Sequence, residues 1–141
     1  MIVPFILELR VQPEWTGGAG EYLPILYKWF AAGSGSGRMY DMILTNFDAE
    51  SRIPPSIGIR SEDVPAGSTI YDEYPGLLAV NNWPSGDNQI TVEVGRAEPR
   101  VSHPDPMKPY EDWTLIPTDR KTATVRVTGA PVEQKRGPFG F

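Results

Sequence analysis

The segment Tyr22–Phe47, YLPILYKWFAAGSGSGRMYDMILTNF, is the part of the chain that is richest in large apolar and aromatic side chains. It divides into Tyr22–Phe30 and Arg38–Phe47, which are joined by the linker Ala31–Gly37 (AAGSGSG). Tyr, Ile, Trp and Phe favour the pleated surface of a sheet, so the first half is predicted to be a strand. The glycine-rich linker then predicts a hairpin tip, with Arg38–Phe47 as the returning strand.

A short helix over Tyr22–Phe30 is the alternative interpretation. Pro24 would then lie in the first helical turn and Gly33 would cap the C-terminus. This alternative would make the fold α+β instead of all-β.

The rest of the chain contains further strand patterns, of which Gln89–Gly95 and Thr122–Gly129 alternate most clearly between apolar and polar residues. The other predicted strands are Met1–Val11, Ile57–Arg60, Ser68–Tyr74 and Leu77–Val80. About eight short strands with a turn signal every 8–15 residues predict an all-β fold, an antiparallel β-sandwich or barrel.

The first strand, Met1–Val11, carries an alternation that predicts which of its faces is buried. Phe5, Leu7, Leu9 and Val11 fall on one face, and the charged Glu8 and Arg10 fall on the other. We therefore expect the first four side chains to point into the core.

Two segments depart from the strand pattern. Arg96–Asp119 contains five prolines and is predicted to be a long, extended and irregular excursion. Ala130–Phe141 is a polar segment ending in two phenylalanines, which predicts an extended C-terminal arm. The expected organisation is thus one β domain over residues 1–129, with the excursion at 96–119 and the arm at 130–141.

The composition limits the classes of function. The chain has 141 residues, which matches one domain with its own core. Its net charge is −5 and it has no long basic run, so a nucleic-acid partner is not expected. It has no cysteine, which excludes disulfides, Cys-ligated zinc and thiol nucleophiles from this sequence.

The N-terminal residues and the hydropathy of the chain predict where it is made. Met1–Arg10 lacks a basic region before its short apolar run, which is not typical of a signal peptide. No apolar run approaches the roughly 20 residues of a membrane-spanning helix. We expect synthesis in the cytoplasm without a signal peptide and no association with a membrane.

Candidate catalytic and cofactor-binding residues are sparse. Nucleotide-binding, zinc-protease and nucleophile-elbow motifs are missing from the sequence. The single histidine, His103, is followed by Pro104 and Pro106, which hold the backbone extended, so neighbouring acids such as Asp105 would diverge from it. The sequence therefore predicts a protein that is not an enzyme and has no cofactor or metal.

Three tryptophans, Trp15, Trp83 and Trp113, lie in predicted loops. Such residues could form a stacking platform for sugar rings, anchor a protein interface, or fold back to cap the core. The first possibility makes a carbohydrate-binding module the alternative hypothesis for this chain.

The leading hypothesis is a non-enzymatic structural subunit of a larger protein assembly. The favoured example is a small virion protein, such as a capsid decoration, collar or tail component. A proline-stiffened excursion and an arm with apolar anchors are suited to wrapping a partner surface. The partners would be subunits of the same assembly, either further copies of this chain or a major shell protein. The residues expected to bind them are Trp83, Tyr110, Trp113, Phe139 and Phe141.

Overall fold

The computed structural model describes residues 1–16, 22–47, 56–78 and 85–129, and the described residues form strands and no helix. This all-β architecture confirms the predicted fold class. The strands are β1 (Ile2–Val11), β2 (Glu14–Trp15), β3 (Tyr22–Gly33), β4 (Ser36–Thr45), β5 (Ser56–Pro65), β6 (Thr69–Leu78), β7 (Gly86–Pro99) and β8 (Trp113–Val127).

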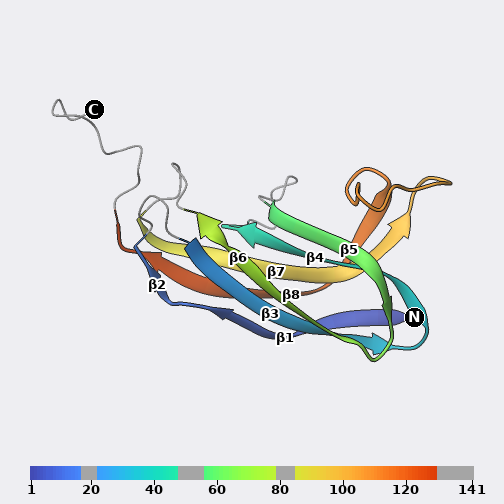
Figure 1. Ribbon diagram of the computed structural model, residues 1–141, viewed down its shortest axis with the longest axis horizontal. Helices are drawn as coiled ribbons and strands as arrows, with labels where there is room; N and C mark the ends of the chain where they lie inside the picture. Colours follow the sequence, from blue (N-terminus) through green and yellow to red (C-terminus); the bar gives the residue numbers. More distant parts are fainter. Residues whose placement is uncertain (17–21, 48–55, 79–84, 130–141) are drawn as a thin grey trace.

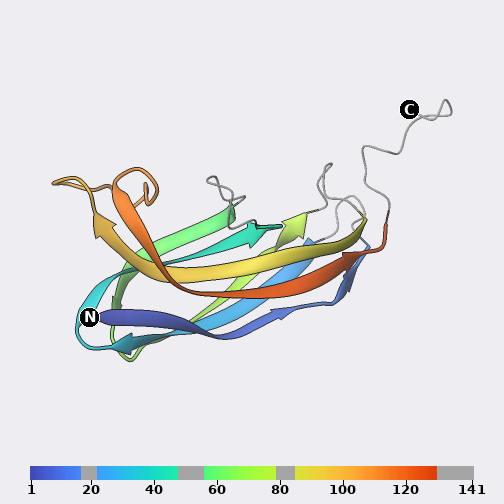
Figure 2. The ribbon, with the colours of Figure 1, turned by 180° about the vertical axis from the view of Figure 1, so that it is seen from behind.

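The strands form two sheets that pack face to face as a sandwich (Figures 1 and 2). The smaller sheet has the order β1-β3-β6 and the larger one the order β2-β8-β7-β4-β5. Neighbouring strands are antiparallel except for the two-residue pairing of β2 with β8, which is parallel. The predicted sandwich is therefore confirmed.

The segment Tyr22–Phe47 forms strands in both halves, which rules out the helical alternative for Tyr22–Phe30. The predicted hairpin is wrong, however, because β3 and β4 lie in different sheets. The chain passes from one sheet to the other through a bend at Gly33 and Gly35, whose φ angles are 124° and 84°. A Cβ atom on Gly33 would lie 2.2 Å from the carbonyl oxygen of Met1, so the bend requires a glycine there.

A second bend runs beside the first one. β5 pairs with β4 in the larger sheet, and β6 pairs with β3 in the smaller sheet. At the corner, the Ala66 amide donates to the Gly35 carbonyl and the Gly67 amide donates to the Ala31 carbonyl, both at 2.8 Å. The four strands thus form one long two-stranded ribbon that folds over the core at these bends.

The core lies between the two sheets. The inner faces of β1 and β3 supply apolar side chains from the smaller sheet, and β4, β7 and β8 supply them from the larger one. The fully enclosed members include Leu23, Ile25, Trp29, Ile90 and Val92. Burying such side chains contributes about 1.5–3 kcal/mol each, so this layer is the main source of stability.

The strand β1 exposes the side chains that its alternation predicted to be buried. Ile2 and Ile6 face the core, whereas Phe5 and Leu7 are 41% and 43% exposed. A register shift between Ile6 and Glu8 then reverses the phase, so that only the second half of the strand follows the prediction. One inserted residue is sufficient for this, because side chains alternate with a period of two.

The predicted irregular excursion over Arg96–Asp119 is wrong at both of its ends. β7 continues to Pro99 and β8 begins at Trp113, and these two residues are paired across the sheet. Only residues 100–112 form a connecting loop, which projects beyond the ends of β7 and β8 (Figure 1). The predicted C-terminal arm at 130–141 lies outside the described residues, so that domain boundary stays a prediction.

Candidate functional site

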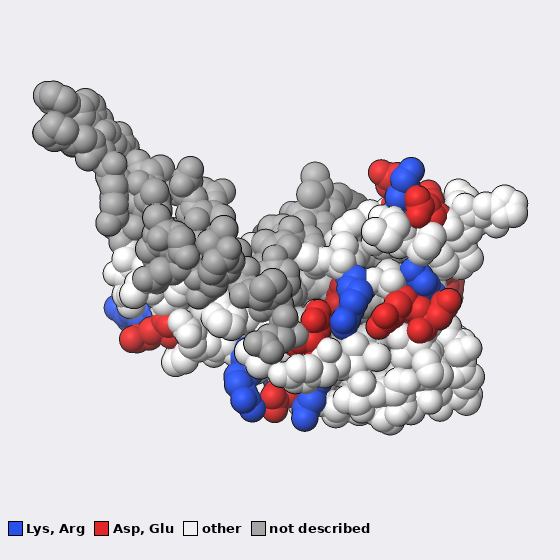
Figure 3. Space-filling model, in the orientation of Figure 1, with Lys and Arg blue, Asp and Glu red and all other residues white. Residues whose placement is uncertain are grey.

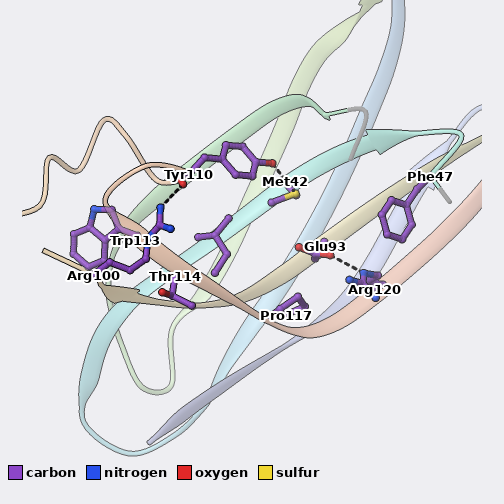
Figure 4. A pocket seen from close by; sticks show the side chains of 10 residues that line it. Met42, Phe47, Glu93, Arg100, Tyr110, Trp113, Thr114, Pro117 and Arg120 are labelled. Carbon is purple, nitrogen blue, oxygen red and sulfur yellow. Dashed lines mark hydrogen bonds and ion pairs between the residues drawn. The ribbon is translucent and has the colours of Figure 1, made fainter. Parts of the chain in front are cut away.

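A pocket of about 400 Å³ lies on the outer face of the larger sheet, against the connecting loop at 100–112 (Figure 4). β4 contributes Met42 and β7 contributes Glu93. The lining residues of β8 are Trp113, Thr114, Leu115, Pro117 and Arg120. Arg100 and Tyr110 of the loop and Phe47 complete the wall.

The pocket has an apolar base because the larger sheet is buried on both of its faces around β4. A second apolar cluster forms there around Tyr40, Met42, Leu44 and Ala97, all at most 6% exposed. Leu115 and other partly buried side chains pack against this cluster. The side chains of β4 are therefore buried alternately in the main core and in this second cluster.

A buried carboxylate provides the polar end of the pocket. The Glu93 side chain is 7% exposed and its Oε1 accepts a hydrogen bond of 2.6 Å from Nε of Arg120. Its Oε2 accepts a hydrogen bond of 2.8 Å from the Tyr40 hydroxyl. Burial and this hydrogen bond raise the pKa of Tyr40 above its ordinary value, so Tyr40 remains a donor to the carboxylate.

The connecting loop is attached to its own sheet by two aromatic residues. The Tyr110 hydroxyl donates to Sδ of Met42 at 3.3 Å, and the Trp113 indole donates to the Asp105 carbonyl at 3.1 Å. The Arg38 guanidinium lies 5.4 Å from the centre of the Trp113 ring. The loop therefore does not extend freely, although its residues Val101 and Met107 are 47% and 84% exposed.

The structure brings two of the predicted partner-binding or sugar-binding residues together, namely Tyr110 and Trp113. Trp15 is 3% exposed and belongs to the main core, so of the three possibilities given for the tryptophans it folds back onto the core, and a role for it in a sugar platform is wrong. The reason is that the short strand β2 adds Trp15 to the edge of the larger sheet. Trp83, Phe139 and Phe141 lie outside the described residues.

Sequence reasoning missed the pair formed by Glu93 and Arg120. The alternation of β7 placed Glu93 on the outer face of the strand, which is correct. The pattern does not show that neighbouring strands and Arg120 cover this outer face. Thus no local signal in the sequence distinguishes Glu93 from an ordinary exposed glutamate.

A second polar group lies in the main core, near the edge formed by β5 and β6. Asp41 is 2% exposed and accepts hydrogen bonds from the Tyr27 hydroxyl at 2.9 Å and the Trp29 indole at 2.9 Å. Arg60 donates to the same carboxylate at 2.6 Å. The Tyr27 hydroxyl also lies 3.1 Å from Oδ2 of Asp72. These contacts connect both sheets across the edge of the sandwich.

The electrostatics of this buried group follow from its contacts. Burial, followed by the charges of Asp41 and Asp72, raises the pKa of Tyr27 above its ordinary value. Burial alone would lower the pKa of Arg60, but Asp41 and Asp72 raise it overall. Tyr27 therefore stays protonated and Arg60 stays charged. In the sequence, Asp41 is a single acidic residue among the apolar residues of β4. This pattern is the signal that could have indicated a buried carboxylate.

The outer face of the smaller sheet is apolar around the first half of β1, whereas Lys28 of β3 lies between Glu8 and Tyr71 on the same face. Val3, Phe5 and Leu7 of β1 are 46%, 41% and 43% exposed, and Tyr71 of β6 is 57% exposed. The ring of Phe5 packs edge-on against Phe30 of the central strand, with ring centres 5.8 Å apart. Figure 3 shows a surface without charged side chains at its lower right, where Figure 1 draws the bends that join β3 to β4 and β5 to β6. We call these apolar residues, Val3, Phe5, Leu7, Phe30 and Tyr71, the outer apolar face.

Residues that could hold a metal do not gather in the part of the chain that the structure describes. No group of three or more His, Asp or Glu side chains lies in a metal-binding arrangement among those residues. His103 is exposed in the connecting loop. Within the described ranges, no helix has the length and hydropathy needed to cross a membrane.

Comparison with known proteins gives no match to a protein-family model or to a curated protein sequence. The function must therefore be argued from the geometry of the pocket and of the outer apolar face.

Proposed function

We propose that the chain is a non-enzymatic structural subunit of a larger protein assembly, such as a decoration, collar or tail protein of a virus particle. The observation that supports this role is the outer apolar face. An antiparallel sheet with one face on the core usually presents polar residues on its other face. Here β1 instead exposes Val3, Phe5 and Leu7 by more than two fifths each.

An exposed apolar surface of this kind favours a protein partner. Monomeric proteins seldom expose contiguous apolar patches unless the patches are functional. The aromatic residues Phe5, Phe30 and Tyr71 are of the type that is enriched at interfaces. β1 is an edge strand of the smaller sheet, and its Ile6 amide and Pro4 carbonyl are bound by Asp119 and Thr118 of β8. A second copy would therefore cover the face of this sheet and not its edge.

The partner assigned to this face is a further copy of the chain, and the test is its oligomeric state. Sedimentation equilibrium of the full chain should show self-association that the double substitution Phe5→Ser and Leu7→Ser weakens at least tenfold. The matched control is Val101→Ser, because Val101 is equally exposed at 47% but lies in the connecting loop. A wild-type chain that stays monomeric at high protein concentration would count against this proposal, as would a double variant that associates as the wild type does.

A second candidate function is a carbohydrate-binding module, and the pocket is the observation that favours it. Trp113 and Tyr110 line a cavity together with hydrogen-bonding and charged groups. This combination is typical of sites for sugars and other small polar ligands. The second function uses a different face from the proposed interface, so the two can be tested separately.

A further inference from the structure

We infer that the pocket on the larger sheet binds a sugar ring that carries a carboxylate, such as a hexuronate or a sialic acid. This inference rests on the second candidate function and names its ligand class. It is independent of the outer apolar face, which lies on the other sheet. Three properties of the pocket carry it: its charge, its fixed arginine and its mixture of apolar and hydroxyl groups.

The charge of the lining favours an anion. Arg100 and Arg120 supply two positive charges, and Glu93 supplies one negative charge. Both oxygens of Glu93 already accept hydrogen bonds within the protein, from Tyr40 and Arg120. The pocket lining is thus positive by one charge, although the whole chain has a net charge of −5.

Arg120 is held in place for a bidentate contact. Its Nε donates to Glu93 at 2.6 Å and its guanidinium lies 5.0 Å from the centre of the Phe47 ring. The side chain is nevertheless 43% exposed. A guanidinium has five N–H donors, and the Nε bond uses one of them. The two terminal amino groups can then bind the two oxygens of a carboxylate, at little conformational cost.

Arg100 supplies the second positive charge from the loop, at the other end of the pocket. Its Nη2 donates to the backbone carbonyls of Tyr110, at 2.6 Å, and of Glu111. Figure 4 shows Arg100 and Arg120 on opposite sides of the pocket, with Glu93 beside Arg120. A carboxylate bound at Arg120 would therefore place the rest of the ligand toward Arg100 and the loop.

The remaining lining suits a sugar ring better than a purely apolar acid. Leu115 and Pro117 present apolar surface to the C–H groups of a ring. The Tyr110 hydroxyl donates to a sulfur atom, Sδ of Met42, which is a weak acceptor that a ligand hydroxyl can replace. Thr114 adds an exposed hydroxyl at the rim.

The size of the cavity is consistent with a ligand of this class. Its volume is about 400 Å³, and small-molecule sites span about 300–1,000 Å³. It therefore has room for a sugar ring and its carboxylate.

The test is a titration of the full chain with glucuronate, N-acetylneuraminate, glucose and phenylacetate. Binding is measured by NMR amide shifts and by calorimetry. We expect saturable binding of one or both acidic sugars at millimolar concentration, with shifts confined to the pocket residues of β7, β8 and the loop. Glucose should bind at least tenfold more weakly because it lacks the carboxylate. Phenylacetate should also bind more weakly because it lacks ring hydroxyls.

A matched pair of variants tests the assigned arginine. Arg120→Lys keeps a positive charge beside Glu93 but loses the two-pronged donor, so affinity should fall at least tenfold. Arg126→Lys is the control, since Arg126 is exposed on the same strand outside the pocket, and its affinity should equal that of the wild type. Arg100→Gln provides a second test that does not disturb Glu93, and it should also weaken binding.

Several outcomes would overturn the inference. The absence of saturable binding by every probe would remove the ligand site. Equal affinity for glucose and glucuronate would show that Arg120 does not bind the ligand carboxylate. Tighter binding of phenylacetate than of the acidic sugars would show that the pocket does not select a sugar ring. A loss of acidic-sugar binding in the Phe5 and Leu7 double variant would show that the pocket is not independent of the interface.

Discussion

Replacement of Asp41 by alanine should be among the most destabilising single changes in this protein. The Asp41 carboxylate accepts hydrogen bonds from Tyr27, Trp29 and Arg60, at 2.9, 2.9 and 2.6 Å. It is 2% exposed, so water cannot replace these contacts. Removing it also leaves a cavity in the core between the sheets.

The expected loss can be worked out contact by contact. The Trp29 indole N–H is left unsatisfied in a side chain that is 1% exposed, which costs about 1–3 kcal/mol. The Tyr27 hydroxyl retains its hydrogen bond to Asp72, at 3.1 Å, so it adds little to the loss of stability. The Arg60 side chain is 35% exposed and recovers part of its hydration. Together with the cavity, the loss for Asp41→Ala should be about 3–5 kcal/mol, in line with the breaking of a buried ion pair.

Asp41→Asn should cost much less, about 1–2 kcal/mol, because charged hydrogen bonds are roughly twice as strong as neutral ones. The asparagine oxygen can still accept from Trp29 and Arg60. Its amide group can donate to the Tyr27 oxygen, because the Tyr27 proton can turn to Asp72. Only the charge of the group is then lost.

The assay is urea unfolding at neutral pH, followed by tryptophan fluorescence, to obtain the free energy of unfolding. The matched control is Asp63→Ala, since Asp63 is 80% exposed and lies 3.9 Å from Arg38; it should change stability by less than about 0.5 kcal/mol. A loss below about 1 kcal/mol for Asp41→Ala, or equal losses for the alanine and asparagine variants, would refute the reasoning about this buried group.

Two further predictions concern stability. Burial raises the pKa of Tyr27 and Tyr40 in the folded state. The stability that these two protonated hydroxyls contribute is therefore complete below the unfolded-state pKa, near 10, and is lost progressively as the pH rises above it. The free energy of unfolding should thus fall by about 1.4 kcal/mol per pH unit for each tyrosine above roughly pH 10, and urea titrations that show no change from pH 10 to 11 would contradict this. Gly95→Ala should destabilise by about 3 kcal/mol, because its Cβ would lie 2.2 Å from the Ile116 carbonyl oxygen. Gly35→Ala meets no atom within 4 Å and strains only a φ of 84°, so it should cost about 1 kcal/mol, and equal losses of unfolding free energy for the two variants would be the contrary result.

Local patterns in the sequence identified part of every strand except β2, whose residue Trp15 was predicted to lie in a loop, and they missed the full length of β5, β7 and β8. The aromatic and β-branched residues of Tyr22–Phe30 favour a strand over a helix, and the alternation in Gln89–Gly95 and Thr122–Gly129 marks β7 and β8. Such patterns depend on the conformation of neighbouring residues, which a short window of sequence contains. They also indicated a sandwich or a barrel, since many strands with one apolar face must bury it against another layer or close on themselves, and they did not decide between the two.

The contacts between distant segments were not available from the same patterns. Whether β4 pairs with β3 or crosses to the other sheet depends on β5 and β6, which begin 11 and 24 residues after the end of β4. The bulge after Ile6 reversed the buried face of β1, and the parallel pairing of β2 with β8 drew Trp15 into the core.

The pocket shows the same division between local and distant information. Glu93 and Trp113 are recognisable in the sequence as polar and aromatic strand or loop residues, but their shared cavity exists only after β4, β7 and β8 are aligned in one sheet. Alternation specifies that a side chain points out of a sheet; whether that side chain meets water or a neighbour is set by strands that are distant in sequence, because their pairing brings in the groups that cover it.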